Sequence, residues 1–250
     1  MMRSVPAQEV LGIAVEGLDM DGAVAAVVAL LDAHRAEPER ATALVATVNP
    51  EFLMLARRDP EFRKVLEAAA LRLADGSGVV WALRRRGEAA TQVAGADLVP
   101  RLAGAAAERG YRLYLLGAGP GVTEAAAAHL RSEHPNLQVV GAESGSPSPE
   151  HDLAQADRIR ATSADLVLVA YGAPGQELWI SRNAGRLGAG VAIGVGGTFD
   201  YLAGRVRRAP RVWRRLHGEW AWRLLHEPWR ARRMAVLPHF ALLVLLGRDR

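Results

Sequence analysis

Asp75 stands between a short apolar run and the turn Gly76-Ser77-Gly78. A carboxylate in this place has two uses. Its side chain can cap the helix that follows, or it can act as a general base beside a bound substrate. The residues alone support both interpretations equally, so the catalytic hypothesis depends on what surrounds Asp75.

Five turns combine glycine with polar residues of the kind that bind sugars and phosphates. They are residues 47–50, 75–78, 117–121, 171–177 and 194–200. Each follows an expected strand. In open α/β sheets ligands bind beyond the carboxyl ends of the strands, because the loops converge there with helix N-termini pointing inward. The sequence therefore places the expected ligand site at this edge of the sheet.

Two of these turns also have simpler interpretations. Gly117, Gly119 and Gly121 begin like a dinucleotide fingerprint, but the last glycine of GxGxxG would stand at position 122, which is Val. A tight strand-to-helix turn explains these glycines at least as well, and a backbone contact to phosphate stays open. Gln176 and Glu177 open a helix, where capping is the simpler account.

The sequence shows no credible metal motif. Asp19-Met20-Asp21 resembles the DxD motif of nucleotide-sugar enzymes, yet it directly precedes an amphipathic run, so helix capping explains it better. The seven His form no HExxH spacing. The absence of Cys excludes a disulfide framework, a Cys-type zinc site and a thiol nucleophile, and it fits a reducing compartment. We therefore expect no metal and no cofactor.

Short apolar runs alternate with longer alanine-rich stretches of helical period, which is the pattern of βα units around a largely parallel sheet. Strands are expected at residues 43–48, 71–74, 112–116, 138–141, 166–170 and 191–195. Helices are expected near residues 21–34, 50–70, 77–86, 96–109, 122–133, 150–162 and 176–187. The pattern predicts a Rossmann-like α/β fold. It stops near Gly204, which predicts a catalytic domain, residues 1–204, and a helical appendage, residues 205–250.

The appendage is strongly basic and rich in Trp. The chain has a net charge of +4, but residues 205–250 hold twelve Arg against three acidic residues, a net charge of +9, which leaves −5 on the rest. Trp213, Leu216, Trp220 and Leu224 share one helical face. The final apolar stretch, residues 234–246, has 13 residues, fewer than the roughly 20 that span a bilayer. These features predict binding to an anionic membrane surface.

Eight motifs connect these features in one order along the chain. They are TVNPEF (47–52), ADGSGVVWA (74–82), VAGADLVPRL (93–102), YLLGAGPGV (114–122), DLVLVAYGAPGQELWI (165–180), GVGGTFDYLAG (194–204), RAP (208–210) and EWAWRLLHEPWRARR (219–233). Through them the chain resembles the WecG/TagA/CpsF glycosyltransferases over nearly its whole length. The order and spacing of the motifs are specific in a way that no single glycine turn is.

The resemblance implies an inverting, metal-independent transfer of a sugar, often N-acetylmannosamine, from a UDP-sugar donor to a polyprenyl-diphosphate-linked sugar acceptor, in the synthesis of surface polysaccharide or teichoic acid. It implies Asp75 as the base, Thr47 and Gln176 as polar active-site residues, and Asp200 as a nucleotide contact. The remaining substrate-binding candidates are Asn49, Gly117, Gly119, Tyr171, Gly172, Gly196, Gly197, Arg223, Arg230 and Arg233. The three arginines are implied to close over the diphosphates. Gly175 departs from the family, in which many members have Lys or Arg there.

Two other hypotheses stay open at this stage. A nicotinamide-dependent oxidoreductase would use the βα pattern and the glycine turn, but the fingerprint is incomplete. A non-enzymatic membrane or nucleic-acid adaptor would use the basic appendage, but it leaves the polar turns unexplained. We expect a cytoplasmic protein, peripheral on the inner face of the membrane, because residues 1–10 show no signal peptide. We expect no nucleic-acid partner. The sugar, the acceptor sugar and a homo-oligomeric state are left undetermined.

Overall fold

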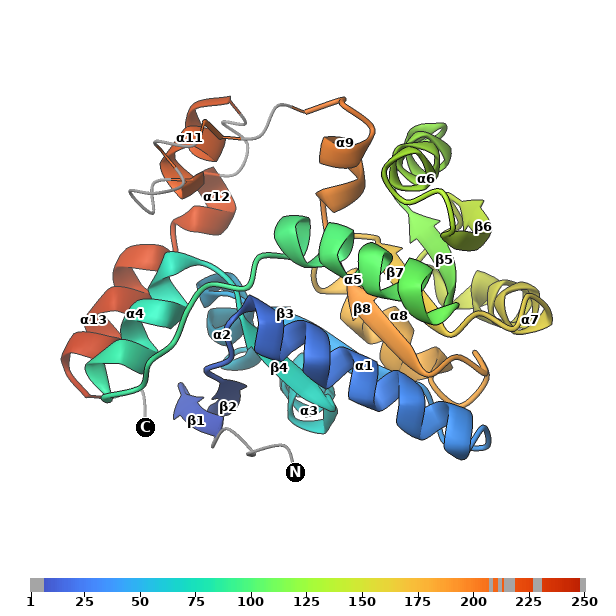
Figure 1. Ribbon diagram of the computed structural model, residues 1–250. Helices are drawn as coiled ribbons and strands as arrows, with labels where there is room; N and C mark the ends of the chain where they lie inside the picture. The colour runs from blue at the N-terminus through green and yellow to red at the C-terminus, as the bar shows by residue number, and fades with distance from the viewer. Residues whose placement is uncertain (1–6, 207–208, 211–212, 214–218, 227–230, 248–250) are drawn as a thin grey trace.

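A computed structural model of the chain describes residues 7–206, 209–210, 213, 219–226 and 231–247. In this part of the chain an eight-stranded sheet has the order β1-β2-β4-β3-β8-β7-β5-β6 (Figure 1). The antiparallel pair is β1 with β2, and the other neighbours pair in parallel. The strands are β1 (Ala7–Val10), β2 (Ile13–Glu16), β3 (Ala43–Val48), β4 (Leu71–Ala74), β5 (Arg112–Gly117), β6 (Gln138–Glu143), β7 (Leu166–Ala170) and β8 (Val191–Gly194).

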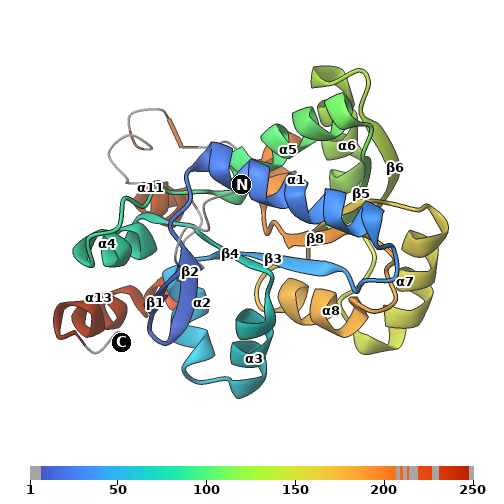
Figure 2. The same cartoon turned by 60° about the horizontal axis from the view of Figure 1, so that its bottom comes forward.

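Helices cover both faces of the sheet, as Figure 2 shows with the sheet seen nearly edge-on. One face packs against α1 (Met20–Ala36), α5 (Gly95–Arg109), α6 (Val122–Glu133) and α9 (Thr198–Leu202). The other packs against α2 (Pro50–Ala56), α3 (Pro60–Ala68), α7 (Asp152–Ala161) and α8 (Gly175–Asn183). The remaining helices are η1 (Pro149–His151), α4 (Ser77–Arg85), α11 (Glu219–His226), α12 (Ala231–Met234) and α13 (Leu237–Leu245).

The central strands are buried on both faces, which explains their unbroken apolar runs. Every residue of β7 and β8 is buried. Strands of parallel sheets lie between two helical layers, so they lack the polar alternation of half-exposed strands. The apolar residues of these strands divide between two hydrophobic clusters, one on each face of the sheet. The α/β fold predicted from the sequence is confirmed, with all six expected strands in place.

The N-terminal hairpin of β1 and β2 was not predicted. Its two-residue turn is Leu11-Gly12, and both residues have positive φ, 52° and 76°. Such a turn usually contains Asn or Asp before Gly, so Leu11 hides the hairpin from sequence-based prediction. Strand β2 joins the sheet by pairing in parallel with β4, and β1 then forms an antiparallel edge strand.

The helix expected at residues 50–70 is wrong in its extent, because two helices occupy this range. Helix α2 ends before Arg57, and α3 begins after Asp59, whose side chain accepts hydrogen bonds from the backbone N–H groups of Glu61 and Phe62. Pro60 has no N–H and suits the first position of a new helix. The capping interpretation of Asp19 is confirmed, since Asp19 Oδ1 accepts from Gly22 N at 2.8 Å.

The described parts of the C-terminal segment are helical and contact the body. Helix α13 packs against α2 and α4, and Phe240 is buried in the same cluster as Phe52. The rings of Trp213 and Trp222 lie 6.0 Å apart. Leu216 lies outside the described residues. Within the described ranges no helix has both the length and the apolar character to span a membrane.

Candidate functional site

A pocket of about 770 Å³ opens at the carboxyl ends of four adjacent strands, β4, β3, β8 and β7. Thr47 lies in β3, and Asp75 directly follows β4. Gly172 comes from the connection between β7 and α8, Gln176 from the start of α8, and Gly196 and Gly197 from the connection after β8. Asn49, which follows β3, also lines the pocket. The sheet therefore brings together seven of the residues that the sequence nominated.

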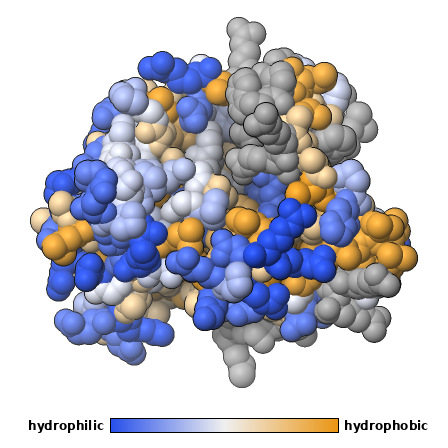
Figure 3. All heavy atoms as spheres, turned by 180° about the vertical axis from the view of Figure 1, so that it is seen from behind, coloured by the Kyte–Doolittle hydropathy of each residue, from blue (hydrophilic) through white to orange (hydrophobic). Residues whose placement is uncertain are grey.

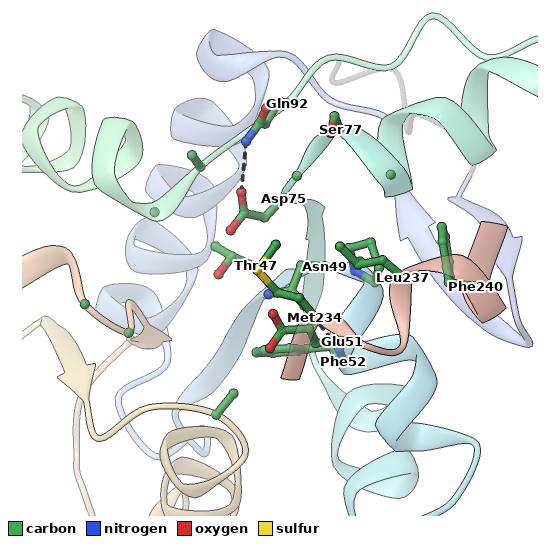
Figure 4. Close-up of a pocket in the computed structure, with 18 of the residues that line it drawn as sticks. Thr47, Asn49, Glu51, Phe52, Asp75, Ser77, Gln92, Met234, Leu237 and Phe240 are labelled. Atoms are coloured by element: carbon green, nitrogen blue, oxygen red, sulfur yellow. Dashed lines mark hydrogen bonds between the residues drawn. The ribbon is translucent and has the colours of Figure 1, made fainter. Parts of the chain in front are cut away.

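Asp75 is held at the end of β4 by backbone hydrogen bonds. Asp75 N donates to Val48 O at 2.8 Å, which continues the pairing of β4 with β3. The first helical residue after it is Ser77, the N-cap position is Gly76, and no side chain caps this helix. The capping alternative for Asp75 is therefore not what the structure shows. The carboxylate faces the pocket instead (Figure 4).

Gln92 is a pocket residue that the sequence did not reveal. Its Nε2 donates to Asp75 Oδ1 at 3.3 Å, the contact drawn as a dashed line in Figure 4. Val93 N donates to Ala74 O at 2.8 Å, which fixes this segment beside the end of β4. No sequence signal marks Gln92, because it lies 17 residues from Asp75 in an irregular connection.

Two polar residues from the end of β3 face the same space. Thr47 is buried, and its hydroxyl donates to Gly194 O of β8 at 3.4 Å. Asn49 caps α2 by accepting from Phe52 N at 3.1 Å. Glu51, in the first turn of α2, is a second carboxylate in the pocket lining that the sequence did not nominate. Its position within the motif TVNPEF could have identified it as a site residue.

Gln176 ties two loops of the pocket together. Its Oε1 accepts from Gly172 N at 3.1 Å and from Gly196 N at 3.0 Å, and its Nε2 donates to Glu177 Oε1 at 2.7 Å. Neither glycine N–H belongs to the first turn of α8, which has no side-chain cap. The capping interpretation of Gln176 and Glu177 is therefore wrong. Burial raises the pKa of Glu177 to about 7.

Several nominated residues lie outside the described lining of this pocket: Gly117, Gly119, Tyr171 and Asp200. Gly117 ends β5, where an added Cβ would lie 2.7 Å from the backbone of Ala170 in β7, so only glycine fits. The hydroxyl of Tyr171 donates to Gln155 at 2.6 Å, and burial raises its pKa. Asp200 lies in α9, where its backbone carbonyl accepts from Arg205 N at 2.9 Å.

The nominated arginines belong to the C-terminal segment. Arg223 is a residue of α11 and Arg233 of α12, and Arg230 lies outside the described residues. The described part of this segment gives the pocket an apolar wall. Met234, Leu237 and Phe240 line it, together with Trp81 of α4.

Among the described residues, no group of three or more His, Asp or Glu side chains is placed to hold a metal ion. The polar side chains of the pocket include the hydroxyl of Thr47, the carboxylates of Asp75 and Glu51, and the amides of Gln92 and Gln176. These groups can accept a proton and orient hydroxyl groups.

A Rossmann-like sheet with a carboxylate, a hydroxyl and amides at the ends of four adjacent strands is typical of α/β enzymes, which bind their ligands at the carboxyl edge of the sheet. A family model, Glycosyl transferase WecG/TagA/CpsF family, matches residues 8–250. The chain belongs to this family and is a glycosyltransferase, as the motifs of its sequence indicated.

Two curated relatives share about a third of their residues with the chain. The N-acetylglucosaminyldiphosphoundecaprenol N-acetyl-beta-D-mannosaminyltransferase of Bacillus subtilis is 35% identical over 204 residues, which cover 81% of this chain and 79% of the relative. The enzyme of the same name from Bacillus spizizenii is 33% identical over the same shares. The names of both relatives describe glycosyltransferases that act on a lipid-linked acceptor.

Proposed function

We propose that this chain transfers a sugar, N-acetylmannosamine or a related hexose, from a UDP-sugar to an N-acetylglucosamine linked through diphosphate to a polyprenol. The observation that supports it most directly is Asp75, a carboxylate that faces the pocket and accepts a hydrogen bond from Gln92. The acceptor is taken from the names of the two Bacillus relatives. The product would serve cell-surface polysaccharide or teichoic acid synthesis.

The chemistry is a single displacement with inversion. Asp75 accepts the proton of the acceptor hydroxyl as the hydroxyl oxygen forms a bond to the anomeric carbon. The bond from that carbon to the donor diphosphate breaks on the opposite side, and its electron pair leaves with UDP. Thr47 and Gln176 line the pocket with Asp75 and are assigned to orient the two reactants.

The leaving diphosphate gains negative charge that the protein must stabilise. Asn49 and Gly197 line the pocket and are assigned to this charge. The N–H groups of Gly172 and Gly196 already donate to Gln176, so these two glycines are assigned to shaping the substrate site. The nucleoside is assigned to the neighbouring turn with Gly117 and Gly119 and to Tyr171 and Asp200, across the ends of β7 and β5. Arg223, Arg230 and Arg233 are assigned to the diphosphates, because a guanidinium group binds two phosphate oxygens at once.

The apolar wall suits an acceptor that stays in a membrane. Helix α13 lines the pocket with Leu237 and exposes Leu242 and Leu245, and Leu246 at its C-terminal end is exposed as well. Figure 3 shows hydrophobic side chains gathered at the edge of the molecule that corresponds to α13. With the basic residues of the same segment, this surface supports attachment to the anionic inner face of the membrane.

The test is a screen of UDP-sugars against a short-chain lipid-diphosphate-N-acetylglucosamine analogue, with the product identified by mass. We expect one added N-acetylhexosamine with UDP-N-acetylmannosamine as donor. Another UDP-sugar giving the only product would keep the reaction class and change the sugar. The absence of any product with every donor and this acceptor would contradict the proposed function.

A further inference from the structure

Helix α8 begins with two buried polar side chains next to each other. Gln176 is 2% exposed and Glu177 is 0% exposed. Gln176 lines the pocket, whereas Glu177 is not part of its described lining. Carboxyl groups are seldom fully buried unless another group pairs with them, because burial removes their hydration. The contacts of Glu177 must therefore explain why a carboxyl group is buried at this position.

The contact between the two side chains fixes which way the Gln176 amide points. Glu177 Oε1 accepts from Gln176 Nε2, while Gln176 Oε1 accepts from the N–H groups of Gly172 and Gly196. An amide has its donors on the nitrogen and its acceptor on the oxygen. Turning this amide over would bring its NH₂ group against two N–H donors and its oxygen against a carboxyl oxygen. Glu177 thus favours the orientation that the two loops need.

The surroundings of Glu177 leave the pair little freedom. A Cβ at Gly194 would lie 2.3 Å from Glu177 Oε1 and 2.5 Å from Gln176 Nε2, so the pair rests directly on the backbone of β8. The carbonyl of the same glycine accepts from the Thr47 hydroxyl. Glu177 Oε2 is buried and has no hydrogen-bond partner among the described residues. An arrangement that leaves a buried oxygen unpaired costs stability, which argues for a role in the site.

We propose that Glu177 is a positioning residue for sugar transfer. It orients the Gln176 amide so that Gln176 Oε1 joins the loop after β7 to the loop after β8, and in this way it holds one side of the pocket in a single arrangement. The effect on turnover rests on the proposed function, but the effect on the two loops does not.

Two substitutions of Glu177 distinguish the effect of side-chain length from the effect of charge. Glu177→Gln keeps the length and an acceptor oxygen but removes the charge. Glu177→Asp keeps the charge but is one methylene shorter, so it cannot keep the 2.7 Å contact with Gln176 Nε2 without moving the helix. Asn183→Leu is the matched control. Asn183 is also fully buried on α8 and donates to Trp179 O, but it is not among the described residues of the pocket.

Hydrogen exchange of the Gly172 and Gly196 amides and transfer kinetics are measured for each variant. Glu177→Asp should speed exchange at both glycines and lower kcat about tenfold or more, because small misplacements in a site are costly. The KM for the acceptor should change less. Glu177→Gln should keep both within about threefold of the wild type, since its oxygen restores the hydrogen bond. Asn183→Leu should lower the Tm and leave both measurements unchanged.

Unchanged exchange at both glycines in Glu177→Asp would overturn the proposal. So would a Glu177→Gln variant as impaired as Glu177→Asp, since charge rather than orientation would then matter. If the wild type transfers no sugar, the proposed function fails, and the exchange data still decide whether Glu177 holds the loops.

Discussion

The pocket has two unlike walls. The polar wall comes from strand ends, where Thr47, Asp75 and Gln176 are positioned by the pairing of β3, β4 and β8 and by hydrogen bonds between loops. The apolar wall comes from helices, with Trp81 on α4 and Leu237 and Phe240 on α13. The first wall is suited to proton transfer and binding of hydroxyl groups, the second to contact with a lipid-linked acceptor.

Leu237 and Phe240 of the apolar wall lie after the boundary predicted at Gly204, whereas Trp81 and the polar wall lie before it. The division into residues 1–204 and 205–250 stays a prediction, but the pocket takes residues from both parts. The C-terminal segment therefore shapes the pocket itself. If the walls divide the work as proposed, substitutions in the polar wall should change turnover, and substitutions on the outer face of the apolar wall should change membrane binding.

The largest effect is expected from the polar wall. Asp75→Asn should lower kcat about 100-fold to 10,000-fold, the usual contribution of a general base, while UDP binding measured by calorimetry persists. Asp59→Asn is the matched control, because Asp59 caps α3 and Asn can cap equally well. A loss of less than about tenfold in Asp75→Asn would remove Asp75 as the base.

The next effect tests whether the C-terminal segment takes part in chemistry. Replacing Arg223, Arg230 and Arg233 together by Ala should lower turnover on the order of 100-fold on a soluble short-chain acceptor, since charge on the leaving diphosphate loses its stabilisation. A triple variant that loses vesicle binding but turns over the soluble acceptor normally would show that these arginines contact the membrane only.

A smaller effect is expected on the outer face of the apolar wall. Leu242, Leu245 and Leu246 are 51%, 56% and 57% exposed, so Ser at these positions should not disturb the core. Binding to anionic vesicles in a sedimentation assay should weaken about tenfold, most clearly at high salt, where electrostatic attraction is screened. Leu153→Ser on α7 is the control, because Leu153 is 58% exposed and lies on a different helix. Equal binding by the triple variant and the wild type would remove α13 from the membrane contact.

Removal of metal ions is expected to have no effect on activity. Activity should persist in excess EDTA, because the proposed mechanism assigns the charge on the diphosphate to arginines and backbone N–H groups. Complete loss in EDTA with recovery in Mg²⁺ or Mn²⁺ would mean that a cation shares the work of the polar wall, and Asp19 and Asp21 would then need to be tested as ligands.

The sequence predicted the parallel core well because periodicity there reflects burial directly. The strands 43–48, 71–74 and 166–170 match the structure residue for residue. It failed in two places for different reasons. The turn Leu11-Gly12 lacks the usual hairpin residues, so no local signal marks it. Asp59-Pro60 is a helix-start signal that was not used, and the prediction therefore merged α2 and α3 into one helix.

The site was predicted from the turns after the strands. These turns indicate where a ligand site lies, but not which side chains contact one another there. The sequence nominated Thr47, Asp75 and Gln176, and the structure brings all three to one pocket. It missed Gln92 and Glu177, because the role of each depends on a contact across the fold or on full burial. It also assigned Gln176 and Glu177 to helix capping, since their position at the start of α8 suits a cap.

The sequence by itself determined the α/β class, the family and the polar residues at the strand ends, because these follow from periodicity and from motifs of adjacent residues. Only the tertiary structure decided which of those residues share a pocket, since the strand order β4-β3-β8-β7 places side by side segments that lie up to about 150 residues apart. It also decided that Asp75 faces the pocket and that Glu177 is buried behind Gln176. Burial and side-chain direction depend on neighbours from distant parts of the chain, and no local pattern encodes them.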